Sequence, residues 1–90
     1  MSVEPRIQRN SQVAYRNVGG GGGALLHLET GAYFGLNPIG AAIWELIDGQ
    51  RSRSQIVQEL RGRLEDPPPG LEAEVTAFLD GLRERDLISA

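Results

Sequence analysis

The chain has 90 residues, 40% of them hydrophobic, and a formal net charge of −3 at pH 7. This length fits one small domain, and the hydrophobic content is too high for a disordered chain. There is no cysteine, which excludes a disulfide framework, thiol catalysis and thiolate metal sites. No apolar run reaches the length of a membrane span, and the N-terminal MSVEPRIQRN lacks the apolar core of a signal peptide. We therefore expect a cytoplasmic protein with no membrane partner.

The start of the chain predicts a tail followed by a strand. Residues 1–10 are polar and show no periodicity, so we expect a flexible tail there. Residues 12–18, QVAYRNV, alternate loosely and are typical of a strand. Five glycines at 19–23 favour a flexible hairpin loop, because glycine loses the most backbone entropy on ordering. A phosphate-binding loop is rejected, since a strand pattern follows the glycines and the chain has no lysine.

Two further strands are predicted after the glycines. Residues 24–29, ALLHLE, alternate in hydrophobicity, and the Thr-Gly pair at 30–31 is typical of a tight hairpin turn. Residues 32–36, AYFGL, form the third predicted strand, with Phe34 and Leu36 on one face. The three segments predict an antiparallel meander.

The second half of the chain predicts three helices. An Asn-Pro pair at 37–38 suits the start of the first helix, and an Asp-Gly pair at 48–49 suits its end. The SRSQ run at 52–55 is a capping box that opens the second helix. The prolines of 65–70 cannot continue a helix, so the third helix is expected over about 71–86. Its predicted inner face consists of Leu71, Val75, Phe78, Leu79 and Leu82.

The order of these elements predicts the fold class. Three short strands followed by three helices indicate an α+β protein with a winged-helix-like architecture, in which a three-stranded antiparallel sheet precedes three helices. We expect the folded domain to cover residues 11–90, preceded by the flexible tail at 1–10.

The chain offers no convincing catalytic set. His27 is the only histidine, and a lone histidine on a strand is more often a surface or half-buried residue than a base. Glu29 lies on the same predicted strand face and could only tune its charge. One histidine and no cysteine make a zinc site improbable. We expect a protein that is not an enzyme and that needs no cofactor and no metal.

Arginine supplies all the positive charge. The clusters are Arg51, Arg53, Arg61 and Arg63 around the second helix, and Arg83 with Arg85 in the third. A solvated face is the simplest interpretation, since long charged side chains usually cover surface. The alternative is a winged-helix DNA-binding or regulatory module. The net negative charge, the missing lysines and the short second helix argue against it, so we expect no nucleic-acid partner.

The third predicted strand is a sheet edge without protection. Natural edges carry lysine, proline, bulges or inward charges, and AYFGL has none of these. Its open backbone groups must meet another part of this chain or another chain. A groove between this strand and the third helix could accept an extended peptide as a fourth strand. The tail at 1–10 or dimerisation could equally cover the edge.

Three segments together resemble the PqqD-like family of small peptide-recognition domains, which act on ribosomally made peptide natural products. These segments are LETGAYFGLNPIGAAIWELIDG at 28–49, RSRSQIVQEL at 51–60 and EVTAFLDGLRERDLI at 74–88. The likeness covers about residues 11–90. Within the family, the form LNPIGAAIWELIDG in a stand-alone chain is similar to the leader-binding proteins of split lasso-peptide pathways. The five-glycine run departs from the family pattern.

The resemblance implies a function. Members of this family bind the leader peptide of a precursor as an added strand between the third strand and the third helix. They then present the precursor to separate enzymes, which in lasso pathways are a leader protease and an ATP-dependent ring-forming enzyme. The missing neighbour of the third strand would then be a leader peptide.

The resemblance also implies a set of peptide-binding residues. The strand wall would consist of Ala32, Tyr33, Phe34, Gly35 and Leu36. The helix wall would consist of Val75, Phe78, Leu79 and Leu82, with Arg83 or Asp80 at the rim. We expect Phe34, Leu36 and Phe78 to serve mainly as core, because a small domain needs those side chains inside. Tyr33, Leu79 and Arg83 are the stronger candidates for peptide contact.

Overall fold

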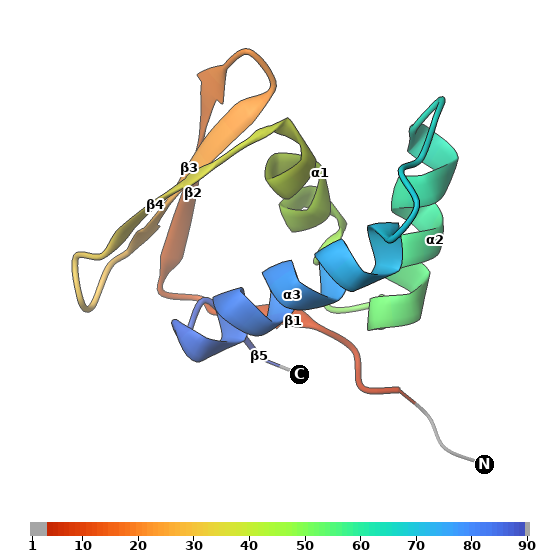
Figure 1. Cartoon of the computed structure of the whole chain (residues 1–90). Helices are drawn as coiled ribbons and strands as arrows, with labels where there is room; N and C mark the ends of the chain where they lie inside the picture. Colours follow the sequence, from red (N-terminus) through yellow and green to blue (C-terminus); the bar gives the residue numbers. More distant parts are fainter. Residues whose placement is uncertain (1–3, 90) are drawn as a thin grey trace.

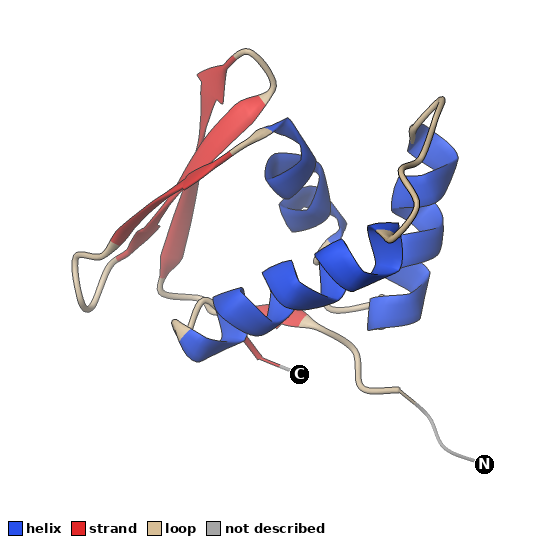
Figure 2. Ribbon diagram, viewed as in Figure 1, coloured by secondary structure: helices blue, strands red, loops and turns tan. Residues whose placement is uncertain are grey.

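The sheet and the helices follow one another along the chain in the predicted order. The computed structural model describes residues 4–89. Figure 1 shows the sheet on one side of the molecule and α2 on the other, with α1 between them and α3 across the front, and Figure 2 separates helices from strands by colour. The elements are β1 (Gln8–Arg9), β2 (Val13–Gly19), β3 (Gly22–His27), β4 (Tyr33–Leu36), α1 (Pro38–Leu46), α2 (Arg53–Arg63), α3 (Leu71–Glu84) and β5 (Ile88–Ser89). This arrangement confirms the predicted α+β class.

The glycine run differs from the predicted loop. Gly19 ends β2, and Gly22 and Gly23 belong to β3, so the connection is a tight turn centred on Gly20 and Gly21. Both turn residues have positive φ angles, of 63° and 83°, which favour glycine. The strands therefore extend into the run and leave only a short hairpin turn.

The sheet is antiparallel, with strand order β2-β3-β4. In β4, Leu36 is buried and Phe34 is half-buried, while Tyr33 and Gly35 are exposed. This alternation confirms the predicted faces. β3 packs against α1, so the inner face of the sheet meets the helical layer.

The starts of α1 and α2 are stabilised as the sequence predicts. The Asn37 side chain accepts a hydrogen bond from the Gly40 N–H at 2.7 Å, and Pro38 occupies the first turn of α1. Ser52 and Gln55 form a capping box at the start of α2, in which each side chain bonds the other's backbone N–H. These caps fix where α1 and α2 begin.

The N-terminal segment, residues 4–10, packs against the rest of the domain, whereas the sequence predicted a flexible tail at 1–10. Ile7 is only 2% exposed, and its backbone bonds to the Arg51 carbonyl and the Gly49 N–H. β1 also pairs with β5 and so joins the two ends of the chain. Burial of an isoleucine side chain, together with these backbone bonds, offsets the entropy lost on ordering the segment. Residues 1–3 lie outside the described part of the chain.

One hydrophobic core joins the sheet, the helices and the N-terminal segment. It includes Leu25 of β3, Trp44 of α1, Ile56 of α2, Leu79 of α3 and Ile7, each no more than 2% exposed. Among the described residues, no helix combines the length and the hydrophobicity that crossing a membrane requires.

Candidate peptide-binding groove

β4 is an open edge in the described part of the chain. It pairs with β3, and no strand within residues 4–89 pairs with its other side. The N-terminal segment, which could have covered this edge, pairs with β5. Within the described residues, the edge thus remains accessible to another chain.

The ladder between β3 and β4 determines which backbone groups face outward. The His27 N–H donates to the Ala32 carbonyl at 2.9 Å, and hydrogen-bonded pairs alternate with non-bonded pairs along an antiparallel ladder. The backbone groups of Phe34 therefore face β3. Those of Tyr33 and Gly35 face away from the sheet, where an added strand would bind them.

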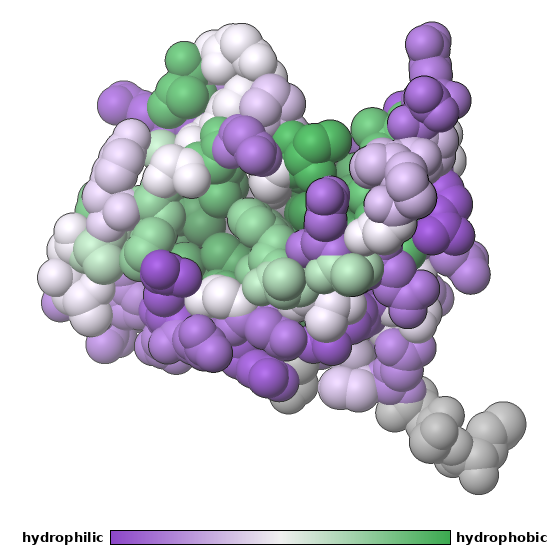
Figure 3. Space-filling model, in the orientation of Figure 1, coloured by the Kyte–Doolittle hydropathy of each residue, from purple (hydrophilic) through white to green (hydrophobic). Residues whose placement is uncertain are grey.

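A groove runs between β4 and α3, beside this open edge. Figure 3 shows hydrophobic side chains gathered in a hollow between the sheet and α3, with hydrophilic residues along the outer side of the helix. The groove is lined by Phe34, Gly35, Leu36, Ala77, Phe78, Gly81, Leu82 and Arg85. An extended chain lying here would have strand backbone on one side and an apolar helix surface on the other.

Small residues create the room for this groove. Ala77 and Gly81 follow one another at a spacing of four on α3, so they share one helix face. A larger side chain at either position would project into the space between α3 and β4. Sequence reasoning missed both residues because it followed the large apolar positions of α3. The signal that could have identified them is the spacing of four residues between Ala77, Gly81 and Arg85, which places two small residues and an arginine on one face of the helix.

The predicted groove residues separate into three groups. Phe34, Gly35, Leu36, Phe78 and Leu82 all line the groove. Ala32 and Tyr33 belong to the edge, and the Tyr33 side chain is 67% exposed. Val75 and Leu79 are buried in the core, at 0% and 1% exposure, and neither lines the groove. The helix turns the Leu79 side chain toward the interior.

The expected rim arginine is Arg83, but the groove contains Arg85 instead. Arg83 lies 3.6 Å from Asp80 and lines a different hollow together with Arg53 and the N-terminal segment. The Arg85 guanidinium lies over the Phe34 ring, 5.2 Å from its centroid. Side chains two positions apart on a helix point about 200° apart around its axis, which places Arg83 and Arg85 on opposite sides of α3.

A second hollow continues from the groove toward the start of α1. It shares Phe78 with the groove and is also lined by Asn37, Ile39, Gly40, Ile43, Leu71, Glu74 and Val75. Ile39 is 38% exposed, so part of its apolar side chain is open to solvent. The apolar surface available to an added strand thus extends along α3 beyond β4.

The arginine cluster at α2 is partly neutralised by acidic residues. Arg51 pairs with Asp48 at 2.7 Å, and Arg53 pairs with Asp80 at 3.1 Å. The backbone N–H of Gln50 lowers the pKa of Asp48, and the charge of Arg51 also lowers it. These pairs weaken the case for a DNA-phosphate face.

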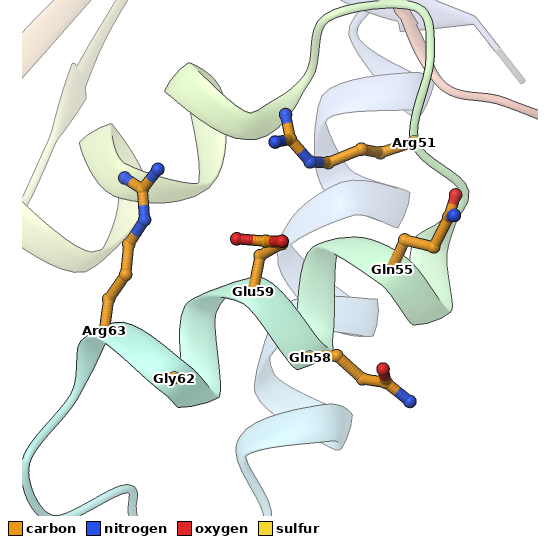
Figure 4. A pocket seen from close by; sticks show the side chains of 6 residues that line it. All are labelled: Arg51, Gln55, Gln58, Glu59, Gly62 and Arg63. Atoms are coloured by element: carbon orange, nitrogen blue, oxygen red, sulfur yellow. The ribbon is translucent and has the colours of Figure 1, made fainter.

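A polar hollow lies on the exposed face of α2. Figure 4 shows Arg51, Glu59 and Arg63 extending to the same side of the helix, with Gln58 directed away. A carboxylate among the arginines would repel a phosphate backbone. This surface therefore adds no support for nucleic-acid binding.

His27 is a structural residue. It is only 2% exposed, which corrects the expectation of a surface or half-buried position. Its Nδ1 accepts from the Glu29 N–H at 3.3 Å, and its Nε2 lies 3.4 Å from Asp86 Oδ2. Both ring nitrogens thus have partners, and the ring links β3 to the end of α3. Within residues 4–89, no three histidine, cysteine or acidic side chains are grouped to hold a metal ion.

Two solved structures share this fold. One, described as TbiB1 in complex with the TbiA(beta) leader peptide, has a TM-score of 0.79 and 28% identity, and the match covers 92% of this chain and 95% of that one. The other is described as lasso peptide synthetase B1 complexed with the leader peptide. It has a TM-score of 0.75 and 20% identity, covers 94% of this chain and 99% of that one, and supports the fold alone.

The comparison with protein-family models agrees with the PqqD-like resemblance of the sequence motifs. No curated protein sequence matches the chain. The family model described as coenzyme PQQ synthesis protein D (PqqD) matches residues 22–88, which include the sheet edge, the groove and all three helices. The chain therefore belongs to the PqqD family.

Proposed function

We propose that this chain binds the leader peptide of a ribosomally synthesised precursor, of the lasso type, as a fourth strand along β4. The observation that carries this proposal is the open backbone edge of Tyr33 and Gly35 beside an apolar groove. It is further supported by TbiB1, whose structure is a complex with a leader peptide and which is 28% identical over most of this chain.

Strand addition would divide affinity and specificity between two sets of groups. The outward N–H and C=O groups of Tyr33 and Gly35 would bond the peptide backbone, whatever its sequence. Alternate peptide side chains would enter the groove and meet Phe34, Phe78 and Leu82. The backbone bonds would supply affinity, and the fit of the alternate side chains would select the leader.

The chain would act as a recognition module and not as an enzyme. By holding the leader, it would raise the effective concentration of the precursor at a separate leader protease and a separate ring-forming enzyme. Such a role requires neither a cofactor nor a metal, and it requires only that the bound peptide leave its cleavage site exposed.

A proline at Gly35 tests strand addition directly. Gly35→Pro removes an N–H that faces away from β3, so the β3–β4 ladder keeps its bonds while an added strand loses a donor. We expect binding of a synthetic leader peptide of a lasso-type precursor to weaken by about tenfold or more. Fluorescence anisotropy of the labelled peptide measures the change.

Gly35→Ala is the matched control, because it keeps the N–H and because a Cβ at this position meets nothing within 4 Å. Thermal unfolding of each variant checks that the fold survives. If Gly35→Pro unfolds, Ala77→Phe replaces it, since a large side chain there would fill the groove without touching the ladder. Unchanged peptide binding in a folded Gly35→Pro or Ala77→Phe variant would contradict strand addition at β4. Absence of binding to the unaltered chain would reject the proposed function.

A further inference from the structure

The groove contains one charged side chain. Among the residues that line it, only Arg85 carries a charge, and the others are apolar or glycine. The Arg85 guanidinium lies 5.2 Å from the centroid of the Phe34 ring. This contact places the charge next to β4, on the strand side of the groove. A cation stacked on an aromatic face keeps the edge of its guanidinium available for hydrogen bonds.

Arg85 has no acidic partner within the described part of the chain. The arginines at 51, 53 and 83 each lie within 4 Å of an aspartate, at Asp48 or Asp80. For Arg85, no carboxylate of residues 4–89 lies within ion-pair distance. The Arg85 guanidinium is thus available to pair with an acidic group from outside residues 4–89.

We infer that Arg85 binds the carboxylate of an aspartate or glutamate in the added peptide strand. This inference rests on the proposed function, because it needs a strand along β4. Side chains that enter the groove alternate along such a strand, and the one that passes Phe34 lies beside the guanidinium. The planar fork of arginine matches a carboxylate in two parallel hydrogen bonds, which a point charge on lysine does not.

The position of the acid along the peptide is also selected. The hollow at the other end of α3 contains Glu74, which would repel a second carboxylate there. About 16 Å of helix separates Glu74 from Arg85 at 1.5 Å per residue. A strand covers this span with about five residues. The groove and this second hollow therefore differ in charge, and an acidic residue is favoured only where the peptide crosses Phe34.

Selection from a displayed library of short random peptides tests this inference whatever the sequence of the natural leader. The full chain, unaltered, is expected to enrich peptides with alternating apolar residues and one aspartate or glutamate at a constant position. Arg85→Glu should replace that acid by lysine or arginine. An enriched acidic peptide should bind Arg85→Gln about fivefold more weakly than the unaltered chain. Arg83→Glu is the matched control, because Arg83 lies two residues away and faces Asp80.

The outcomes separate this inference from the proposed function. An alternating apolar pattern without an acid, or an acid that Arg85→Glu leaves in place, would overturn the role of Arg85 and leave strand addition standing. If no alternating pattern is enriched by a folded chain, both proposals fail. An acidic preference that inverts with Arg85→Glu but not with Arg83→Glu would establish the carboxylate contact.

Discussion

Gly22 shows how a single missing side chain shapes the sheet. A Cβ built on Gly22 would lie 2.8 Å from the Leu36 carbonyl oxygen, a distance that real Cβ atoms essentially never show. The obstacle is backbone, so the neighbouring strand itself would have to shift. The glycine run is thus required in part by close packing of β3 against the end of β4.

We expect Gly22→Ala to lower the free energy of unfolding by about 1–3 kcal/mol, because the added methyl group forces β3 and β4 apart. Urea denaturation followed by circular dichroism measures the difference. Gly62→Ala is the control, since a Cβ there meets nothing within 4 Å and the residue lies in α2. Alanine should stabilise that helix by about 0.5–1 kcal/mol. Equal effects of the two substitutions would contradict the close contact at Gly22.

At the scale of single elements, α2 depends on the capping box at its start. The Ser52 side chain accepts a hydrogen bond from the Gln55 N–H at 3.4 Å, and the Gln55 side chain accepts one from the Ser52 N–H at 2.8 Å. Ser52 is also buried, and its backbone forms a bridge with Arg6. The cap thus connects the start of the helix with the N-terminal segment.

Replacing Ser52 with alanine should cost about 1 kcal/mol of stability, because the first turn loses the side-chain oxygen that accepts from the Gln55 N–H. Ser54→Ala provides the same chemical change inside the helix, at an exposed position, and should be neutral or slightly stabilising. Thermal unfolding of both variants gives the comparison. A Ser54→Ala variant as unstable as Ser52→Ala would show that the cap is not the cause.

The elements also show what local patterns can predict. The helix starts at Asn37 and Ser52 were predicted because a cap is a contact between residues three apart in sequence. β1 and β5 were not predicted, because neither has a partner nearby in the chain and each contains only two residues. The tight turn at Gly20 was missed because a run of glycines is compatible with a flexible loop and also with a strand that packs closely against its neighbours.

At the scale of the whole molecule, Ile7 links the N-terminal segment to the core. It is 2% exposed, and its backbone bonds to both sides of the α1–α2 connection, at Gly49 and Arg51. The segment also carries Arg9, which donates to the Trp44 carbonyl at 2.8 Å. The N-terminal segment is therefore part of the domain from Ile7 onward.

Ile7→Ala should lower the free energy of unfolding by about 2–5 kcal/mol, because it leaves a cavity in a small core. Leu28→Ala removes a similar apolar side chain that is 58% exposed, and it should change stability by no more than about 0.5 kcal/mol. Chemical denaturation of the two variants provides the measurement. If both variants matched the unaltered chain, the packing of Ile7 in solution would be contradicted.

The sequence by itself determined the fold class, the faces of β4 and the helix starts, because each depends on periodicity or on contacts a few residues apart. It also indicated the unprotected edge at AYFGL and, through the motif likeness, the family. The tertiary structure decided which side chains face the groove. Leu79 and Arg83 turn away from it while Gly81 and Arg85 turn toward it, since the angle at which α3 crosses the sheet depends on the packing of the whole core.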